Sequence, residues 1–322
     1  MTAIRFEHIS KIYDDAEEAS VDDVSLEVEQ GSFVVLLGPS GCGKTTLLKM
    51  VNRLHEPSSG TIYMDGVDIR KMALTDLRRK IGYVIQQVGL FPHMTVAKNI
   101  AVVPELVGWE QKRIESRVDE LLSLISLDPE TYRDRYPAQL SGGQQQRIGL
   151  ARALAADPGV MLMDEPFGAI DAINREALQG EMLFLQQKLH KTILFVTHDV
   201  DEALKLADKI VIMDEGRVVQ YAPPCELLTA PANEFVRSLL NADDRIRQLS
   251  MLKVGTVMDA LPEGEIADDV PVLNHDDNLR KALTVMLQPG IGGAVVLQDG
   301  EKVGWLSIQS VQSAGCSEAV QA

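Results

Sequence analysis

The first 240 residues alternate between short apolar runs and longer stretches with a helical period. Residues 5–9 and 24–28 alternate apolar and polar positions, as half-buried strands do. Helical patterns, for example at residues 177–188, separate a set of mostly apolar runs. These runs have the pattern of buried parallel strands, at residues 33–37, 159–163, 192–196 and 210–213. The order predicts an α/β fold built on a doubly wound parallel sheet.

Two other segments differ in pattern. Residues 91–155 are rich in helical signals, and residues 111–126 are strongly amphipathic, so we interpret this part as a helical subdomain inserted into the sheet domain. A polar, helix-like stretch follows at residues 241–249, and the composition changes near Lys253. We therefore predict a main domain, a linker and a small C-terminal α+β module, over residues 1–240, 241–253 and 254–322.

The composition is that of a soluble globular protein, with 45% hydrophobic and 24% charged residues among 322. The net charge of −16 argues against broad nucleic-acid binding, which needs a basic face. No apolar run approaches the roughly 20 residues of a membrane-spanning helix, and the charged N-terminus does not read as a signal peptide. Work at a membrane is therefore expected to proceed through partners. The three cysteines have neither disulfide-like parity nor metal-like spacing, which favours a reducing compartment.

A glycine-rich loop lies between the apolar run at residues 33–37 and an apolar helix at 46–51. The loop consists of Gly38, Pro39, Ser40, Gly41, Cys42, Gly43, Lys44 and Thr45, and Thr46 follows in the helix. In such loops the backbone N–H groups surround phosphates, the lysine reaches the β- and γ-oxygens, and the threonine hydroxyl binds Mg²⁺. The flanking strand and helix favour this interpretation over a purely structural turn.

Two consecutive carboxylates, Asp164 and Glu165, follow the apolar run at 159–163. Asp164 is placed to hold Mg²⁺, directly or through water, and Glu165 to polarise an attacking water. The alternative is a solvated pair in a loop. We prefer the functional interpretation, because unpaired charge at a buried strand end is costly.

Three single positions complete the candidate site. His198 follows the run at 192–196 and, at the carboxyl end of a parallel strand, would face the same crevice as Lys44. A lone histidine is more often a surface or capping residue, so this assignment depends on the other motifs. Gln86 follows an apolar strand pattern and is expected to contact Mg²⁺ or water. Tyr13 is placed to stack on an adenine ring, although an aromatic residue near a strand end is usually part of the core.

A second anion-binding element lies at residues 140–147, where Ser141, Gly142, Gly143 and Gln144 open a helix. The serine can cap the helix, and unpaired N–H groups then point outward toward an anion. The element has no lysine of its own. We therefore expect it to help hold a nucleotide that another element binds.

In their order along the chain, these motifs resemble the ATP-binding subunit of an ABC transporter over about residues 3–240. The resemblance implies a P-loop ATPase that uses ATP and Mg²⁺ and has Walker A at 38–45 and the signature at 140–147. It also implies that Gln86 is the Q-loop residue, that Asp164 and Glu165 form Walker B, and that His198 is the switch histidine. Residues 169–171, ending in Asp171, would be the D-loop.

The family further implies partners. Two such subunits dimerise head to tail, so that each ATP lies between Lys44 of one copy and Ser141, Gly142 and Gly143 of the other. Closure of the dimer drives integral membrane permease subunits, whose coupling helix docks near residues 90–96. The chain would therefore lie peripherally on the cytoplasmic face of the inner membrane, with no nucleic-acid partner.

The whole chain is most similar to ATPases that power uptake of glycine betaine, choline and related quaternary amines. The solute is chosen by the permease and by an extracytoplasmic solute-binding protein, so methionine, polyamine or molybdate uptake stay open. Soluble ABC-type ATPases of DNA repair are less suitable, because the chain has no room for their long coiled coil. Translation-type members usually carry two cassettes, and a P-loop kinase would leave residues 140–147 unexplained.

The tail from residue 254 onward resembles one CBS motif, and it is acidic, with 4 basic and 10 acidic residues from 253 to 322. CBS motifs normally occur in pairs. We hypothesise that the tails of two subunits pair into one module across the ATPase dimer. A sensor of ionic strength or adenine nucleotide and a simple dimer brace are both open as its role.

Overall fold

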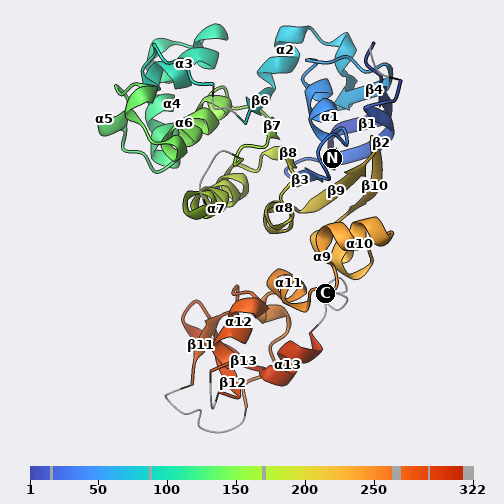
Figure 1. The fold of residues 1–322 in the computed structure, drawn as a ribbon. Helices are drawn as coiled ribbons and strands as arrows, with labels where there is room; N and C mark the ends of the chain where they lie inside the picture. Colours follow the sequence, from blue (N-terminus) through green and yellow to red (C-terminus); the bar gives the residue numbers. More distant parts are fainter. Residues whose placement is uncertain (15–16, 87–88, 169–171, 263–269, 289–290, 315–322) are drawn as a thin grey trace. The chain divides into compact units, whose positions relative to one another are not determined.

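The computed structural model describes residues 1–14, 17–86, 89–168, 172–262, 270–288 and 291–314 (Figure 1). The chain divides into two compact units, Met1–Tyr221 and Ala222–Ala322. This division by compactness falls before the end of the main domain that the sequence predicts near residue 240. The domain boundaries near residues 240 and 254 stay predictions.

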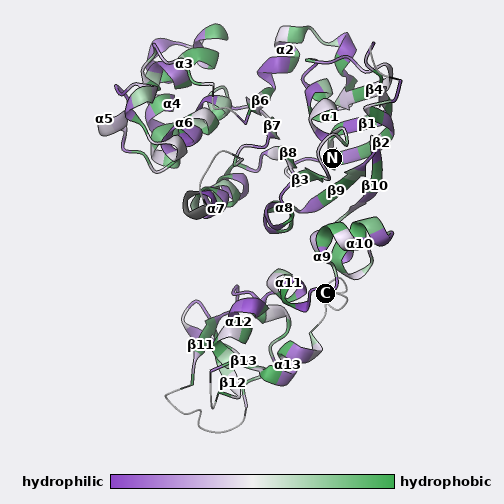
Figure 2. Ribbon diagram, viewed as in Figure 1, coloured by the Kyte–Doolittle hydropathy of each residue, from purple (hydrophilic) through white to green (hydrophobic). Residues whose placement is uncertain are grey.

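A six-stranded sheet forms the centre of the first unit, in the order β10-β9-β3-β8-β7-β6. All the expected apolar runs are strands in it. From one edge to the other, the strands are Arg217–Ala222, Lys209–Asp214, Phe33–Leu37, Thr192–Thr197, Val160–Asp164 and Ile81–Val84. The inner strands pair in parallel and consist mostly of buried hydrophobic residues (Figure 2). The predicted parallel sheet is confirmed.

The register of this sheet aligns the carboxyl ends of three strands. Leu37 of β3 pairs with Thr197 of β8, and Asp164 of β7 pairs with Val196 of β8. The residues that follow these three strands therefore emerge at one edge of the sheet. Helices α1 (Lys44–Val51) and α8 (Val200–Leu206) begin there, after β3 and β8 respectively.

A second sheet of the first unit is antiparallel, and the sequence did not predict it as a separate layer. Its order is β2-β1-β4-β5, and its strands are Val21–Glu29, Thr2–Lys11, Ser59–Met64 and Val67–Asp68. Phe6 of β1, Ile62 of β4, Leu47 of α1 and Leu36 of β3 share one hydrophobic core and are each at most 1% exposed. Helix α1 is thus packed by apolar residues of both sheets.

Four helices follow β6 and form the expected helical part (Figure 1). They are α3 (Val96–Leu106), α4 (Gln111–Leu124), α5 (Pro129–Tyr132) and α6 (Gly142–Leu154). Helix α4 buries Ile114, Val118, Leu121 and Leu122, which confirms its amphipathic pattern. The buried side chain of Asn99 shapes the loop before α3: its Oδ1 accepts from the Phe91 N–H, and its Nδ2 donates to the carbonyl oxygens of Phe91 and Met94.

The remaining helices of the first unit are α2 (Leu74–Arg79) and α7 (Ala172–Leu189), with short 3₁₀ turns at Ile69–Lys71 and Pro137–Gln139. Helix α7 is longer than the pattern at 177–188 indicated. In the part of the chain that the structure describes, no helix is long and apolar enough to cross a membrane.

The second unit holds a three-stranded sheet in the order β11-β12-β13. Strands β11 (Val272–Asn274) and β12 (Gly293–Gln298) are parallel and joined through α12 (Leu279–Met286), and β13 (Glu301–Ser307) pairs antiparallel with β12. Its other elements are α9 (Pro224–Thr229), α10 (Glu234–Leu240), α11 (Arg245–Met251), a 3₁₀ turn (Val254–Thr256) and α13 (Ile308–Ser313).

This unit has its own core, which includes Leu252, Leu273, Leu279 and Leu306. Its likeness to a CBS motif stays a prediction. Cys42 of the first unit is free and buried.

Candidate functional site

The glycine-rich loop connects β3 to α1, and its backbone requires glycine at two positions. A Cβ atom on Gly38 would lie 2.2 Å from the carbonyl oxygen of Met213. Gly43 caps α1 with a φ of 100°, and a Cβ there would lie 2.3 Å from the carbonyl oxygen of Ser20. The loop is therefore packed tightly against neighbouring backbone. Its exit into the N-terminus of α1 gives the outward N–H groups and positive helix end that bind phosphate.

Lys44 lies inside this loop and is only 5% exposed. Its Nζ donates to the carbonyl oxygens of Gly38 at 2.7 Å and Pro39 at 2.8 Å, so the buried ammonium is compensated by backbone dipoles. Burial raises the pKa of the neighbouring Cys42 thiol, against the opposing effect of Lys44. Cys42 is therefore a neutral thiol near neutral pH, and it does not offset the positive charge of Lys44.

Thr45 and Asp164 meet at the end of β7. The hydroxyl of Thr45 donates to Asp164 Oδ1 at 2.9 Å. Burial raises the pKa of Asp164, and the hydrogen bond from Thr45 opposes that shift. Hydroxyl and carboxylate oxygens are the ligands that Mg²⁺ takes in phosphate sites.

These donors fit Mg²⁺ only together with a nucleotide. Among the described residues, no group of three or more His, Cys, Asp or Glu side chains could hold a metal alone. An octahedral ion here would complete its shell with phosphate oxygens and water, as Mg²⁺ usually does. Gln86 lies close to the turn that follows β7, because a Cβ on Gly168 would be 3.2 Å from its Nε2.

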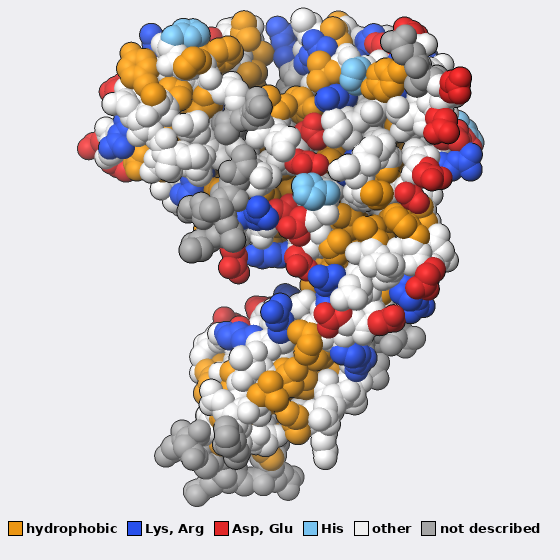
Figure 3. All heavy atoms as spheres, in the orientation of Figure 1, with side chains coloured by type: hydrophobic (Ala, Val, Ile, Leu, Met, Phe, Trp, Pro, Cys, Tyr) orange, Lys and Arg blue, Asp and Glu red, His pale blue; other side chains and the backbone are white. Residues whose placement is uncertain are grey.

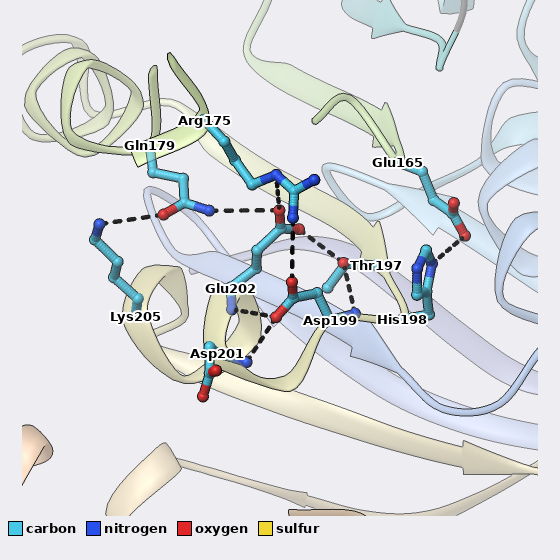
Figure 4. A network of polar contacts seen from close by, with 9 residues as sticks. All are labelled: Glu165, Arg175, Gln179, Thr197, His198, Asp199, Asp201, Glu202 and Lys205. Carbon is cyan, nitrogen blue, oxygen red and sulfur yellow. Dashed lines mark hydrogen bonds and ion pairs between the residues drawn. The ribbon is translucent and has the colours of Figure 1, made fainter. Parts of the chain in front are cut away.

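Glu165 and His198 face each other across the sheet edge, with Oε1 and Nδ1 separated by 3.2 Å (Figure 4). Glu165 has a φ of 44°, in the left-handed region that only glycine adopts without cost. Its N–H donates to the carbonyl oxygen of Val196, and its own carbonyl oxygen accepts from the Gly168 N–H. The turn holds Glu165 in a strained conformation, as often found at functional sites. Side-chain exposures of 25% and 61% leave both groups accessible.

Tyr13 lies beside the start of α1. Its hydroxyl is 3.5 Å from Thr46 Oγ1, its ring meets His55 edge-on, and Lys11 Nζ lies 5.0 Å from the ring centroid. The ring is partly exposed. An aromatic side chain next to the phosphate loop is compatible with base stacking, which stays a prediction.

The element at residues 140–147 begins α6 as expected. Ser141 Oγ accepts from the Gln144 N–H at 3.3 Å, and the Gln144 side chain accepts from the Ser141 N–H at 3.0 Å, which makes a capping box. Gly142 and Gly143 have no atom within 4 Å of where a Cβ would stand. Nothing in the chain's own packing therefore requires glycine at either position.

The structure does not bring this element to the phosphate loop. Within the ranges described, no hydrogen bond or ion pair joins Ser141 to Lys44 or its neighbours, and α6 lies with α3 and α4, apart from α1 (Figure 1). The remaining candidates Lys44, Thr45, Asp164, Glu165 and His198 do gather at one edge. On the face shown in Figure 3, acidic side chains lie along one side of a histidine in the first unit.

Comparison with known proteins agrees with this geometry. A family model described as "ABC transporter" matches residues 21–168. The osmoprotectant import ATP-binding protein OsmV of Salmonella typhimurium is 51% identical, over 84% of this chain and 72% of that protein. The chain belongs to the ABC transporter ATP-binding family.

Two further relatives differ in how much of this ABC ATPase they cover. The glycine betaine uptake system ATP-binding protein YehX of Escherichia coli is 47% identical over 96% of this chain and 98% of its own length. The sulfate/thiosulfate import ATP-binding protein CysA of Gloeobacter violaceus is also 47% identical, but over 74% of this chain and 67% of its own. Among solved structures, the dimeric post-hydrolysis state of the ATP-binding cassette MJ0796 with ADP and Pi aligns with a TM-score of 0.62. It is 32% identical, over 69% of this chain and 98% of that one.

The fold and the ABC-type ATPase activity that the motifs predicted are thereby confirmed. The roles of individual residues stay predictions, and Asp171 of the expected D-loop lies outside the described residues. Sequence reasoning missed a polar network beside His198, formed by Arg175, Gln179, Thr197, Asp199, Glu202 and Lys205 (Figure 4). The sequence places Asp199 and Glu202 as acidic residues at the start of a helix, but it does not show which residues of α7 they contact.

The close approach at Gly38 makes a testable prediction about stability. Gly38→Ala should lower the free energy of unfolding by about 2 kcal/mol or more, because the new methyl group meets backbone that cannot move freely. Gly66→Ala is the matched control, since it has a φ of 77° but open space around its Cβ, and it should cost about 1 kcal/mol. Urea unfolding of the full-length variants measures both. Equal losses would show that the loop is not tightly packed.

Proposed function

We propose that this ABC ATPase powers the uptake of glycine betaine, choline or related quaternary-amine osmoprotectants. The observation that carries the proposal is how far each similarity extends. Relatives named for osmoprotectant, choline, carnitine or glycine betaine import align over 84–96% of this chain. An alignment over 96% includes the tail, whereas the sulfate relative, with 74%, cannot include both the ATPase part and the tail. Uptake of another solute, such as methionine or a polyamine, is the alternative.

In the proposed reaction, the loop from Gly38 to Thr46 holds the phosphates of ATP, and Lys44 leaves its carbonyl partners to contact the β- and γ-oxygens. Thr45, Asp164 and Gln86 would hold Mg²⁺, which neutralises charge on the transferred phosphoryl group. Tyr13 supports the adenine.

Glu165 acts as the general base. It accepts a proton from the attacking water as the oxygen of that water bonds to the γ-phosphorus and the bond to the β–γ bridging oxygen breaks. His198, 3.2 Å from Glu165, donates to a γ-phosphate oxygen and fixes the orientation of the carboxylate. ADP and inorganic phosphate leave, and the proton on Glu165 returns to solvent.

The site is completed by a second copy of the chain in this proposal. The first observation in support is that Gly142 and Gly143 leave open space above the N-terminus of α6. A phosphate can therefore approach the backbone N–H groups of this helix closely. The second is that the aligned MJ0796 cassette was solved as a dimer with ADP and Pi.

The membrane partners are integral permease subunits, served by an extracytoplasmic solute-binding protein. The surface proposed for the permease includes Phe91, 40% exposed, and Leu106, 76% exposed, at the two ends of the region containing α3. The chain would then lie on the cytoplasmic face of the inner membrane.

The general-base role predicts that Glu165→Gln binds ATP and forms the closed dimer but loses about 100-fold or more in turnover. Phosphate release and size-exclusion chromatography with ATP measure the two effects. Glu215→Gln is the control, because Glu215 also follows a sheet strand with a positive φ and should keep turnover. Substantial hydrolysis by Glu165→Gln would reassign the base.

The completion of the site in trans predicts opposite effects of Gly142→Asp on folding and hydrolysis. A carboxylate at the start of α6 should leave stability unchanged or raise it by about 0.5 kcal/mol through the helix dipole. It should lower ATPase turnover about 100-fold by repelling the partner's phosphate. ATP binding by the monomer should be unaffected. Gly180→Asp in α7, where a Cβ also meets open space, should keep turnover; parallel losses in both variants would contradict the model of a shared site.

The solute is tested by uptake of radiolabelled glycine betaine in a strain that lacks its own betaine systems and expresses this ATPase with its permease and binding protein. Uptake should require Lys44, should be lost in Lys44→Ala, and should be reduced by unlabelled choline but not by methionine. Methionine or polyamine uptake without betaine uptake would support the alternative.

A further inference from the structure

Glu202 of α8 is a buried carboxylate that the proposed reaction does not use. It is 6% exposed, and burial raises its pKa. A buried carboxylate is costly unless it is hydrogen-bonded, and replacing it with an apolar residue of similar size is often neutral or stabilising. Its presence therefore needs a reason other than packing.

The first set of contacts ties Glu202 to the two neighbours of His198. Thr197 Oγ1 donates to Glu202 Oε2 at 2.8 Å and accepts from the Asp199 N–H at 3.0 Å. Asp199 Oδ1 in turn accepts from the Glu202 N–H at 3.1 Å and the Asp201 N–H at 2.9 Å. The backbone on both sides of His198 is thus fixed to the first turn of α8.

The second set ties the same carboxylates to α7. Arg175 Nη1 lies 3.5 Å from Asp199 Oδ2, and its Nε lies 3.8 Å from Glu202 Oε1. Gln179 Nε2 donates to Glu202 Oε1 at 3.4 Å, while Lys205 Nζ donates to Gln179 Oε1 at 3.1 Å. Figure 4 shows Glu202 between α7 and Thr197, with the His198 side chain pointing the other way, toward Glu165.

We propose that Glu202 is a positioning residue that, through Thr197 and Asp199 and together with Arg175 of α7, holds His198 at its place beside Glu165. This inference rests on the proposed role of His198 in hydrolysis. A small shift of His198 would be enough to affect hydrolysis, since a displacement of about 1 Å at a catalytic group can lower turnover about 100-fold. Helix α7 begins at Ala172, directly after the expected D-loop at 169–171. A shift at the start of α7 would therefore reach His198 through this network.

The test compares Glu202→Gln in the full-length chain with the same substitution in a His198→Ala background. In the wild-type background, kcat for MgATP should fall about 10-fold or more while KM changes less than about 2-fold, because substrate binding is untouched. In the His198→Ala background, the further loss should be less than about 2-fold, since coupled residues are not additive. A ³²P-phosphate release assay resolves the slow variants. Asp201→Asn, an exposed carboxylate on the same helix, is the control and should keep kcat.

The outcomes separate this inference from the proposed function. Wild-type kcat in Glu202→Gln, with a loss in His198→Ala, would overturn the positioning role alone. Equal losses in both backgrounds would also overturn it and would indicate a general effect on folding. Wild-type kcat in His198→Ala would overturn the role of His198 and this inference with it. If Glu202→Gln does not fold, Arg175→Lys tests the same link, because lysine keeps the charge but lacks the planar fork; the same non-additive loss of kcat is expected.

Discussion

The parallel pairing of β8 between β3 and β7 is the constraint on which the rest of this structure depends. Parallel strands run in one direction, so the residues that follow them emerge at the same edge of the sheet. Leu37, Asp164 and Thr197 lie in this register at the strand ends. This alignment brings Lys44 to the same edge as Glu165 and His198, although Lys44 lies more than a hundred residues before either of them in the chain. The roles proposed for these three residues follow from that alignment.

Three charged side chains at this edge are buried or half-buried, and each is stabilised by a different set of hydrogen-bond partners. The ammonium of Lys44 is held by two carbonyl oxygens, the carboxylate of Asp164 by the Thr45 hydroxyl, and that of Glu202 by a network from two helices. The first two have partners that an incoming phosphate or Mg²⁺ can replace. The partners of Glu202 are all protein groups, which is why we assign it to positioning and not to chemistry.

The start of α6 is the opposite case, because the helix caps itself through its own side chains yet stays open outward. The capping box of Ser141 and Gln144 pairs the groups at the helix start, while Gly142 and Gly143 present bare backbone. A lone chain gains nothing from glycine there, since alanine would favour the helix. The two glycines are therefore consistent with the proposal that a phosphate held by a second copy approaches this helix.

The sequence by itself determined the central parallel sheet, the amphipathic pattern of α4 and the family to which the chain belongs. A short apolar run such as 33–37 is typical of a buried strand, and the order of loop, carboxylate pair and histidine is characteristic of this family. The sequence could not determine the separate antiparallel sheet, because it depends on contacts between distant segments. It also gave no sign that Arg175 and Gln179 meet Glu202. Helical period shows which side of α7 is polar, but only the packing of α7 against α8 decides which polar groups lie within hydrogen-bonding distance.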